Sequence, residues 1–143
     1  FMKGLVTAVQ QRVDHPASNG SVRTLLGRRC RFNLWEPTEF GLHKPLPREQ
    51  AVLEHGPRLK RAYTYKGLNR LIQGSAADQT KKSMLACFQA GKLPLLQVHD
   101  ELCLSVGSVD EANKFAQIMM DCVKLEVPSK VDVETGPSWG EAE

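Results

Sequence analysis

The chain has 143 residues and a formal net charge of +3, from 19 lysines and arginines against 16 aspartates and glutamates. This length suits one domain with a real core, and the apolar stretches are too short for a transmembrane helix. No charged leader precedes an apolar segment, which argues against secretion. The four cysteines are widely spaced, which favours free thiols in a reducing compartment over a disulfide framework or a zinc site.

The small net charge hides a division along the chain. Residues 1–99 carry 16 basic and 6 acidic side chains, and residues 100–143 carry 3 basic and 10 acidic ones. The first segment is therefore at +10 and the second at −7. Such an asymmetry indicates a polyanion-binding face beside an acidic region, although long charged side chains also simply solvate a surface.

The first third of the chain predicts a helix followed by a small hairpin. Apolar side chains in residues 1–13 recur at helical spacing. The segment His15–Gly20 is rich in residues that break helices and form turns. Residues 22–32 are basic and rich in strand formers, so we expect a hairpin with Arg28 and Arg29 near its tip.

A proline-rich segment separates this hairpin from the longest predicted helix. Residues 33–57 contain four prolines and little periodicity, which predicts an irregular insertion with a short helix at 47–55. The apolar stripe of residues 58–89 then predicts a long helix, with Gly74 placed for close packing and Gly91 as the stop signal.

The last third predicts a second hairpin, a helix and a strand. In residues 93–106 two apolar runs surround a polar triplet, which indicates a hairpin with the triplet at or near its tip. Residues 109–123 have the spacing of an amphipathic helix, and residues 130–134 alternate like a strand. The whole order of elements predicts an α+β fold.

The strongest chemical signal is the triplet His99-Asp100-Glu101. Two adjacent carboxylates are costly to bury, and exposed beside a phosphate they are suitable ligands for Mg²⁺. Two-metal phosphoryl transfer uses such carboxylates to hold its metal ions. The alternative is an ordinary polar turn, which is the simpler explanation for the triplet taken alone.

A second signal is the pair Asn69 and Gln73, which are four residues apart and so share one helix face. Their amides can bond the minor-groove acceptors that every base pair presents. A plain solvent-facing surface is the alternative, but basic residues surround the pair and would give salt-sensitive, sequence-independent binding. These basic residues are Arg58, Lys60, Arg61, Lys66, Arg70, Lys81 and Lys82. A second basic group, which is equally well explained as a solvated turn, consists of Arg23, Arg28, Arg29 and Arg31.

Four segments together resemble one family. Gln97-Val98-His99-Asp100-Glu101-Leu102 is similar to the third polymerase motif of family A DNA polymerases, the bacterial polymerase I and phage replicase group. The run from Asn69 to Asp78 resembles the helix before that motif. The basic turn further upstream in the family is similar to Thr24-Leu25-Leu26-Gly27-Arg28-Arg29, and its carboxyl-terminal ending is similar to Gly136-Pro137-Ser138-Trp139. The four occur in family order, and the Leu-Trp-Glu-Pro run at 34–37 looks most like the phage branch. We therefore expect a phage protein in the host cytoplasm.

The resemblance implies a DNA-directed DNA polymerase, a nucleotidyltransferase used in DNA replication. Residues 1–143 would be a carboxyl-terminal palm segment, with 33–57 as an insertion. Asp100 would be a catalytic Mg²⁺ ligand supported by Glu101, and His99 would lie near the primer terminus. The amides of Asn69 and Gln73 would touch the duplex minor groove, and the basic turn at Arg28 and Arg29 would contact DNA. Primer–template DNA and an incoming dNTP would be the partners, with no membrane.

The sequence departs from the family pattern in two places. Family members often have an arginine four residues before the helix asparagine, where this chain has Tyr65, so Lys66 or Arg61 is expected to substitute for it. The family's first motif, with its metal-binding aspartate, and its nucleotide-gripping helix are not found in residues 1–143. We therefore expect the chain to be inactive without an upstream polymerase fragment, either as a subunit of a split polymerase or as a truncation.

Two other functions are compatible with these residues. The first is a non-catalytic DNA-binding module derived from a polymerase palm, against which the intact triplet argues. The second is an independent metal-dependent hydrolase, which needs further carboxylates, and only Asp78 and Asp110 are close by in sequence.

Overall fold

The computed structural model describes residues 2–142 and confirms a mixed fold of helices and small antiparallel sheets. The described residues form two compact units, the first ending at Ser75 and the second beginning at Ala76. The boundary falls within the long helix α3 (Gly67–Gln89). Between residues 2 and 142, no helix combines the length and the apolar character needed to cross a lipid bilayer.

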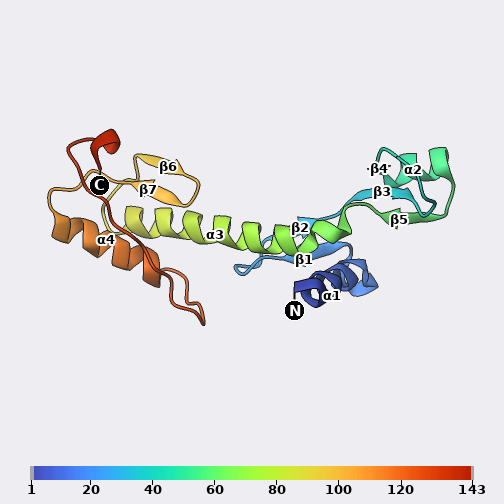
Figure 1. The fold of residues 1–143 in the computed structure, drawn as a ribbon, viewed down its shortest axis with the longest axis horizontal. Helices are drawn as coiled ribbons and strands as arrows, with labels where there is room; N and C mark the ends of the chain where they lie inside the picture. The colour runs from blue at the N-terminus through green and yellow to red at the C-terminus, as the bar shows by residue number, and fades with distance from the viewer. Residues whose placement is uncertain (1, 143) are drawn as a thin grey trace. The chain divides into compact units, whose positions relative to one another are not determined.

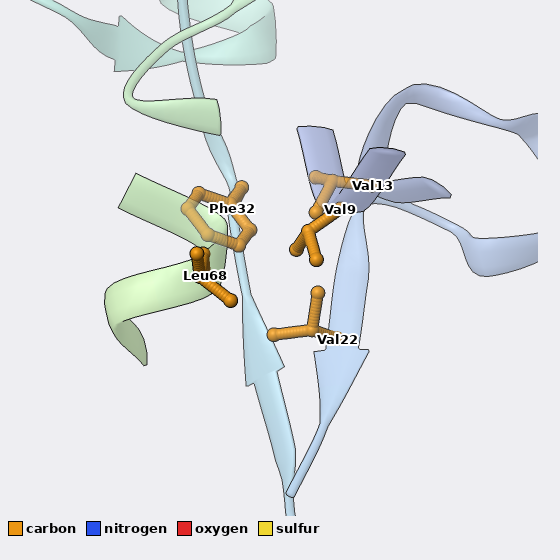
Figure 2. Packing of buried hydrophobic residues seen from close by; sticks show 5 residues of the cluster. All are labelled: Val9, Val13, Val22, Phe32 and Leu68. Atoms are coloured by element: carbon orange, nitrogen blue, oxygen red, sulfur yellow. The ribbon is translucent and has the colours of Figure 1, made fainter. Parts of the chain in front are cut away.

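The core of the first unit joins a helix, a hairpin and the start of α3. The expected first helix is confirmed as α1 (Met2–Asp14), and a short 3₁₀ helix, η1 (Pro16–Ser18), occupies the expected break. The expected hairpin is confirmed as β1 (Ser21–Arg23) and β2 (Arg29–Arg31), with Arg28 in its turn and Arg29 at the start of β2. Figure 2 shows the side chains that these elements turn toward one another: Val9, Val13, Val22, Phe32 and Leu68.

The rest of the first unit corrects two expectations. Residues 33–57 are not wholly irregular, because they contain β3 (Leu34–Pro37), β4 (Leu46–Pro47) and the expected short helix, α2 (Arg48–His55). The long helix does not begin at residue 58, since β5 (Leu59–Arg61) and the 3₁₀ helix η2 (Thr64–Lys66) precede α3. The three strands form an antiparallel sheet in the order β4-β3-β5 (Figure 1).

Both errors have the same physical cause. The sheet pairs Trp35 with Arg61 and Glu36 with Lys60, so its partners lie about 25 residues apart along the chain. Lys60 Nζ lies 3.5 Å from Glu36 Oε1, and the Arg61 guanidinium stacks 4.5 Å from the centroid of the Trp35 ring. Periodicity within a short window does not register such long-range pairing.

The second unit contains the remainder of α3 and the second hairpin. Figure 1 shows the strands β6 (Leu96–Val98) and β7 (Glu101–Cys103), both expected from the sequence. The expected amphipathic helix is confirmed as α4 (Val109–Asp121), which buries Phe115 and Ala116. A short 3₁₀ helix, η3 (Trp139–Glu141), lies near the end of the described residues.

The expected strand at 130–134 is wrong. These residues have no strand conformation and pair with no other strand of the described chain. Just before them Ser129 Oγ accepts a hydrogen bond of 2.8 Å from Gln79 Nε2 of α3, and Lys130 forms an ion pair of 2.5 Å with Asp132. An alternating pattern becomes a strand only where another strand offers its edge, and within residues 2–142 none does so here.

Candidate functional site

The hairpin of β6 and β7 places the triplet where the sequence predicted it. Val98 pairs with Glu101 in the antiparallel register, so His99 and Asp100 form a two-residue turn and Glu101 begins β7. Leu102 and Cys103, on the strand that leaves the turn, are half-buried, whereas all three members of the triplet are exposed. The apolar strand thus anchors a polar tip.

His99 has an unusual backbone conformation at this tip. Its φ is +53°, in the left-handed region that disfavours side chains with a Cβ and that glycine commonly occupies in a two-residue turn. The side-chain amide of Gln97 donates a hydrogen bond to the carbonyl oxygen of His99, which holds the turn. A residue kept in a sparsely populated conformation is a frequent feature of functional sites, so the backbone at the tip marks His99 as a candidate site residue.

The two carboxylates are exposed and unpaired. Within residues 2–142, neither Asp100 nor Glu101 has an ion-pair or hydrogen-bond partner for its side chain. The same residues contain no group of three potential ligand side chains close enough to hold a metal ion. Two free carboxylates suit Mg²⁺, which uses one or two protein carboxylates and completes its shell with water and phosphate oxygens.

The amide pair lies on α3, in the first unit. Because α3 is continuous from Gly67, Asn69 and Gln73 are about 6 Å apart along its axis, and both are exposed. The expected placement on one helix face is confirmed by the unbroken helix. The two amides are therefore available to acceptors outside the protein.

Two of the expected DNA-binding arginines also have roles inside the first unit. Arg61 Nη1 donates a hydrogen bond of 2.9 Å to the carbonyl oxygen of Phe32 while the guanidinium stacks on Trp35. Arg28 Nη2 donates one of 2.8 Å to the carbonyl oxygen of Gly74, which fastens the β1–β2 turn to α3. Both side chains stabilise the scaffold on which the amides lie.

The other two basic residues, Arg29 and Lys66, also have exposed side chains. Arg29 lies directly opposite Arg23 in the β1–β2 register, a pairing of like charges that costs stability unless an anion offsets it. Lys66 ends η2, next to the start of α3, and its ammonium lies over two tyrosine rings. These two cations remain suited to a phosphate backbone.

Gly74 connects the turn and α3 as expected. A Cβ at this position would lie 2.8 Å from Thr24 Cγ2 and 3.4 Å from Arg28 Nη2. Leu25 N also donates a hydrogen bond of 3.0 Å to Ser75 Oγ. The basic turn can approach the helix this closely only because residue 74 lacks a side chain.

Sequence analysis did not assign Tyr65 to the site, although it is exposed in η2, two residues before α3 begins. The signal that could have revealed it is the spacing, because Tyr65, Asn69 and Gln73 follow one another at intervals of four. In the sequence alone, Tyr65 stands out only as a departure from the family pattern.

Comparisons with known proteins point to one family. A family model described as DNA polymerase family A matches residues 2–141. A DNA-directed DNA polymerase of Pseudomonas phage M6 is 44% identical over 98% of this chain. DNA polymerase I of Deinococcus radiodurans is 35% identical over 95% of it, and DNA polymerase theta of Drosophila melanogaster is 32% identical over 97%.

The chain spans only part of these relatives: 18% of the phage protein, 13% of the Deinococcus protein and 7% of the Drosophila protein. The residues that the family model matches nevertheless include α1, both hairpins, α3 and α4. This chain belongs to DNA polymerase family A.

Proposed function

We propose that residues 1–143 are a palm segment of a DNA-directed DNA polymerase and supply the carboxylates of its third motif for Mg²⁺-dependent nucleotidyl transfer. The observation that carries the proposal is the β6–β7 turn, which presents Asp100 and Glu101 exposed and unpaired. Family membership makes this chemistry the most economical use of the two side chains.

Each residue of the turn has a distinct part in the proposal. Asp100 would bind the metal directly, and Glu101, at the first position of β7, would support the site. Bound Mg²⁺ would stabilise negative charge on the attacking and leaving oxygens of the transfer. His99, held at the tip by its neighbours, would orient the primer terminus through a hydrogen bond from its imidazole.

The first unit would contribute the contacts to primer–template DNA. The amides of Asn69 and Gln73 would donate to the minor-groove acceptors common to all base pairs, which binds a duplex without selecting its sequence. Arg29 and Lys66 would neutralise phosphates, and Arg28 and Arg61 would mainly hold the scaffold. A dNTP would be the second substrate.

The remaining polymerase motifs would come from a segment outside residues 1–143. The chain corresponds to less than a fifth of the phage relative, and the triplet supplies only part of a two-metal ligand set. The additional segment would be another part of the same polypeptide or a separate upstream fragment, and the assembled protein would be the active form.

Primer extension by the assembled polymerase tests the proposal. Because several kcal/mol of transition-state stabilisation depend on the metal, Asp100→Asn should reduce extension by about a hundredfold or more. The matched control is Asp132→Asn, which neutralises another exposed aspartate of the second unit and should leave extension unchanged.

Near-normal extension by Asp100→Asn would remove Asp100 from the metal site. Duplex binding that is indifferent to Mg²⁺, with no extension in any assembly, would instead favour a non-catalytic DNA-binding module.

A further inference from the structure

Glu111, in the first turn of α4, contacts both segments that connect the β6–β7 hairpin to its flanking helices. Its Oε2 accepts a hydrogen bond of 2.7 Å from Gly107 N, in the segment between β7 and α4. Its Oε1 lies 2.7 Å from Lys92 Nζ, in the segment between α3 and β6. One carboxylate therefore closes the base of the hairpin whose tip carries Asp100.

Little else holds the base of this hairpin in place. The two connecting segments have neither helix nor strand conformation. The ladder bond nearest the base is the hydrogen bond of 2.9 Å from Leu95 N to the carbonyl oxygen of Cys103. On the entering side Leu93, Leu95 and Leu96 are 62%, 66% and 44% exposed, so burial of apolar surface anchors this side only weakly. The polar contacts of Glu111 consequently have a large share in fixing how the hairpin leaves the helices.

These contacts connect the hairpin to the ends of both helices. Lys92 N donates a hydrogen bond of 3.0 Å to the carbonyl oxygen of Cys87, a fully buried residue of α3. At the other end, the hydroxyl of Ser108 caps α4 by accepting a hydrogen bond of 3.2 Å from Glu111 N. The side chains of Lys92 and Glu111 are 27% and 32% exposed, so solvent screens their ion pair less than at an open surface.

The Glu111 carboxyl is held in its ionised form. The backbone hydrogen bond from Gly107, and then the Lys92 ammonium, lower its pKa from the ordinary value. Both contacts favour the charged form, because each donates to a carboxylate oxygen. Charge-assisted hydrogen bonds of this kind are shorter and stronger than neutral ones, so they suit a contact that must hold two segments together.

We propose that Glu111 is a positioning residue for nucleotidyl transfer, which fixes the direction in which the hairpin presents Asp100. It acts through its contacts to Lys92 and Gly107 and does not itself touch metal or substrate. The loss of a group that orients a metal ligand typically costs about 10–100-fold in metal affinity or activity. The inference rests on the proposed function, because it assigns a supporting residue to the same carboxylate.

The first test needs no metal and measures amide hydrogen exchange in the β6–β7 hairpin of the 143-residue chain by mass spectrometry. Glu111→Ala removes both contacts at the base, so the hairpin amides should exchange several times faster. Lys92→Met removes only the ion pair and should cause a smaller acceleration. Unchanged exchange in Glu111→Ala would overturn the inference.

Ser108→Ala is the matched control for both tests. It removes the cap of α4 but leaves both contacts of the Glu111 side chain, so the hairpin amides should exchange as in the unaltered chain. An acceleration in Ser108→Ala equal to that in Glu111→Ala would show that a loosened helix is the cause, and it would overturn the positioning role.

The second test is the Mg²⁺ concentration that gives half-maximal primer extension by the assembled polymerase. Glu111→Ala should raise this concentration by about tenfold, because Asp100 is no longer held in the orientation that binds the metal. A merely structural role would lower extension at every Mg²⁺ concentration and leave the midpoint unchanged. Ser108→Ala should keep the midpoint of the unaltered protein. An unshifted midpoint in Glu111→Ala would overturn the inference.

The two proposals fail in distinguishable ways. If Glu111→Ala keeps the normal Mg²⁺ midpoint while Asp100→Asn abolishes extension, the positioning role is wrong and the proposed function stands. If Asp100→Asn extends normally, the proposed function is wrong and the positioning role fails with it.

Discussion

Replacing Gly74 by alanine tests whether the basic turn depends on close contact with α3. Gly74 lies inside the helix, where alanine is favoured over glycine by about 1 kcal/mol. Its added Cβ would lie 2.8 Å from Thr24 Cγ2, closer than carbon atoms normally approach. Thr24 is 5% exposed and β-branched, so its side chain has little freedom to move away.

The clash should outweigh the gain in helix propensity. Overpacking of this kind costs about 1–3 kcal/mol, and any movement of the turn also weakens the hydrogen bond from Arg28 to the carbonyl oxygen of Gly74. We expect Gly74→Ala to lower the free energy of unfolding by about 1–2 kcal/mol. For a chain of this size, the melting temperature should fall by about 3–8 °C.

Thermal unfolding followed by circular dichroism measures the effect, and two further variants identify its cause. Gly4→Ala, in α1, adds a Cβ with no other heavy atom within 4 Å, so it should be neutral or stabilising. Thr24→Ser removes the colliding methyl group and keeps the hydroxyl, so in combination it should restore most of the loss. If Gly74→Ala is as stable as Gly4→Ala, the close contact does not constrain the turn.

Three further predictions concern the second unit. Ser108 caps the N-terminus of α4, because its hydroxyl accepts a hydrogen bond of 3.2 Å from the backbone amide of Glu111. In thermal unfolding, Ser108→Ala should lower the free energy of unfolding by about 1 kcal/mol, and an unchanged stability would show that this hydrogen bond does not stabilise the helix. The backbone hydrogen bond from Gly107 and then the Lys92 ammonium lower the pKa of the Glu111 carboxyl. Its stabilising contribution should be complete above the ordinary carboxyl pKa and should vanish as pH falls through the lowered pKa. Glu111→Gln should therefore weaken the dependence of the free energy of unfolding on pH over this acidic range, as measured by acid unfolding. Burial, and secondarily a nearby thiol, raises the pKa of Cys87; iodoacetamide followed by mass spectrometry should find it alkylated more slowly than the other cysteines, and equal rates would contradict its burial.

Local sequence signals predicted the elements that depend on local interactions. The helices α1 and α4 follow from apolar spacing. The β6–β7 hairpin follows from two apolar runs around polar residues, and the confirmed position of its turn includes Asp100. Each of these signals is complete within about 15 residues of chain, which is the range over which periodicity is informative.

The failures involve partners that are distant along the chain. Residues 59–61 carry a basic, helix-compatible pattern and become β5 only because Trp35 and Glu36 lie beside them. Residues 130–134 alternate correctly and still form no strand, since no edge within the described residues accepts them. The outward placement of Tyr65 likewise depends on a bond between Gln10 and Thr64, residues 54 positions apart, which no local pattern records.

The turn that carries the proposed metal ligand allows stability and function to be separated. His99 is left-handed with φ +53°, and a residue with a Cβ pays about 1 kcal/mol for this conformation relative to glycine. His99→Gly should therefore stabilise the β6–β7 hairpin by up to about 1 kcal/mol in urea unfolding. It also removes the imidazole, so primer extension by the assembled polymerase should fall.

His99→Asn is the matched control, because asparagine tolerates the left-handed region and still lacks the imidazole. It should leave stability near that of the unaltered chain and reduce extension as glycine does. A stabilised glycine variant with full extension would show that the imidazole is dispensable. A destabilised glycine variant would show that contacts of the His99 side chain, and not its backbone conformation, dominate the turn. Stability gained together with extension lost is the combination expected if the strain persists because the imidazole is used.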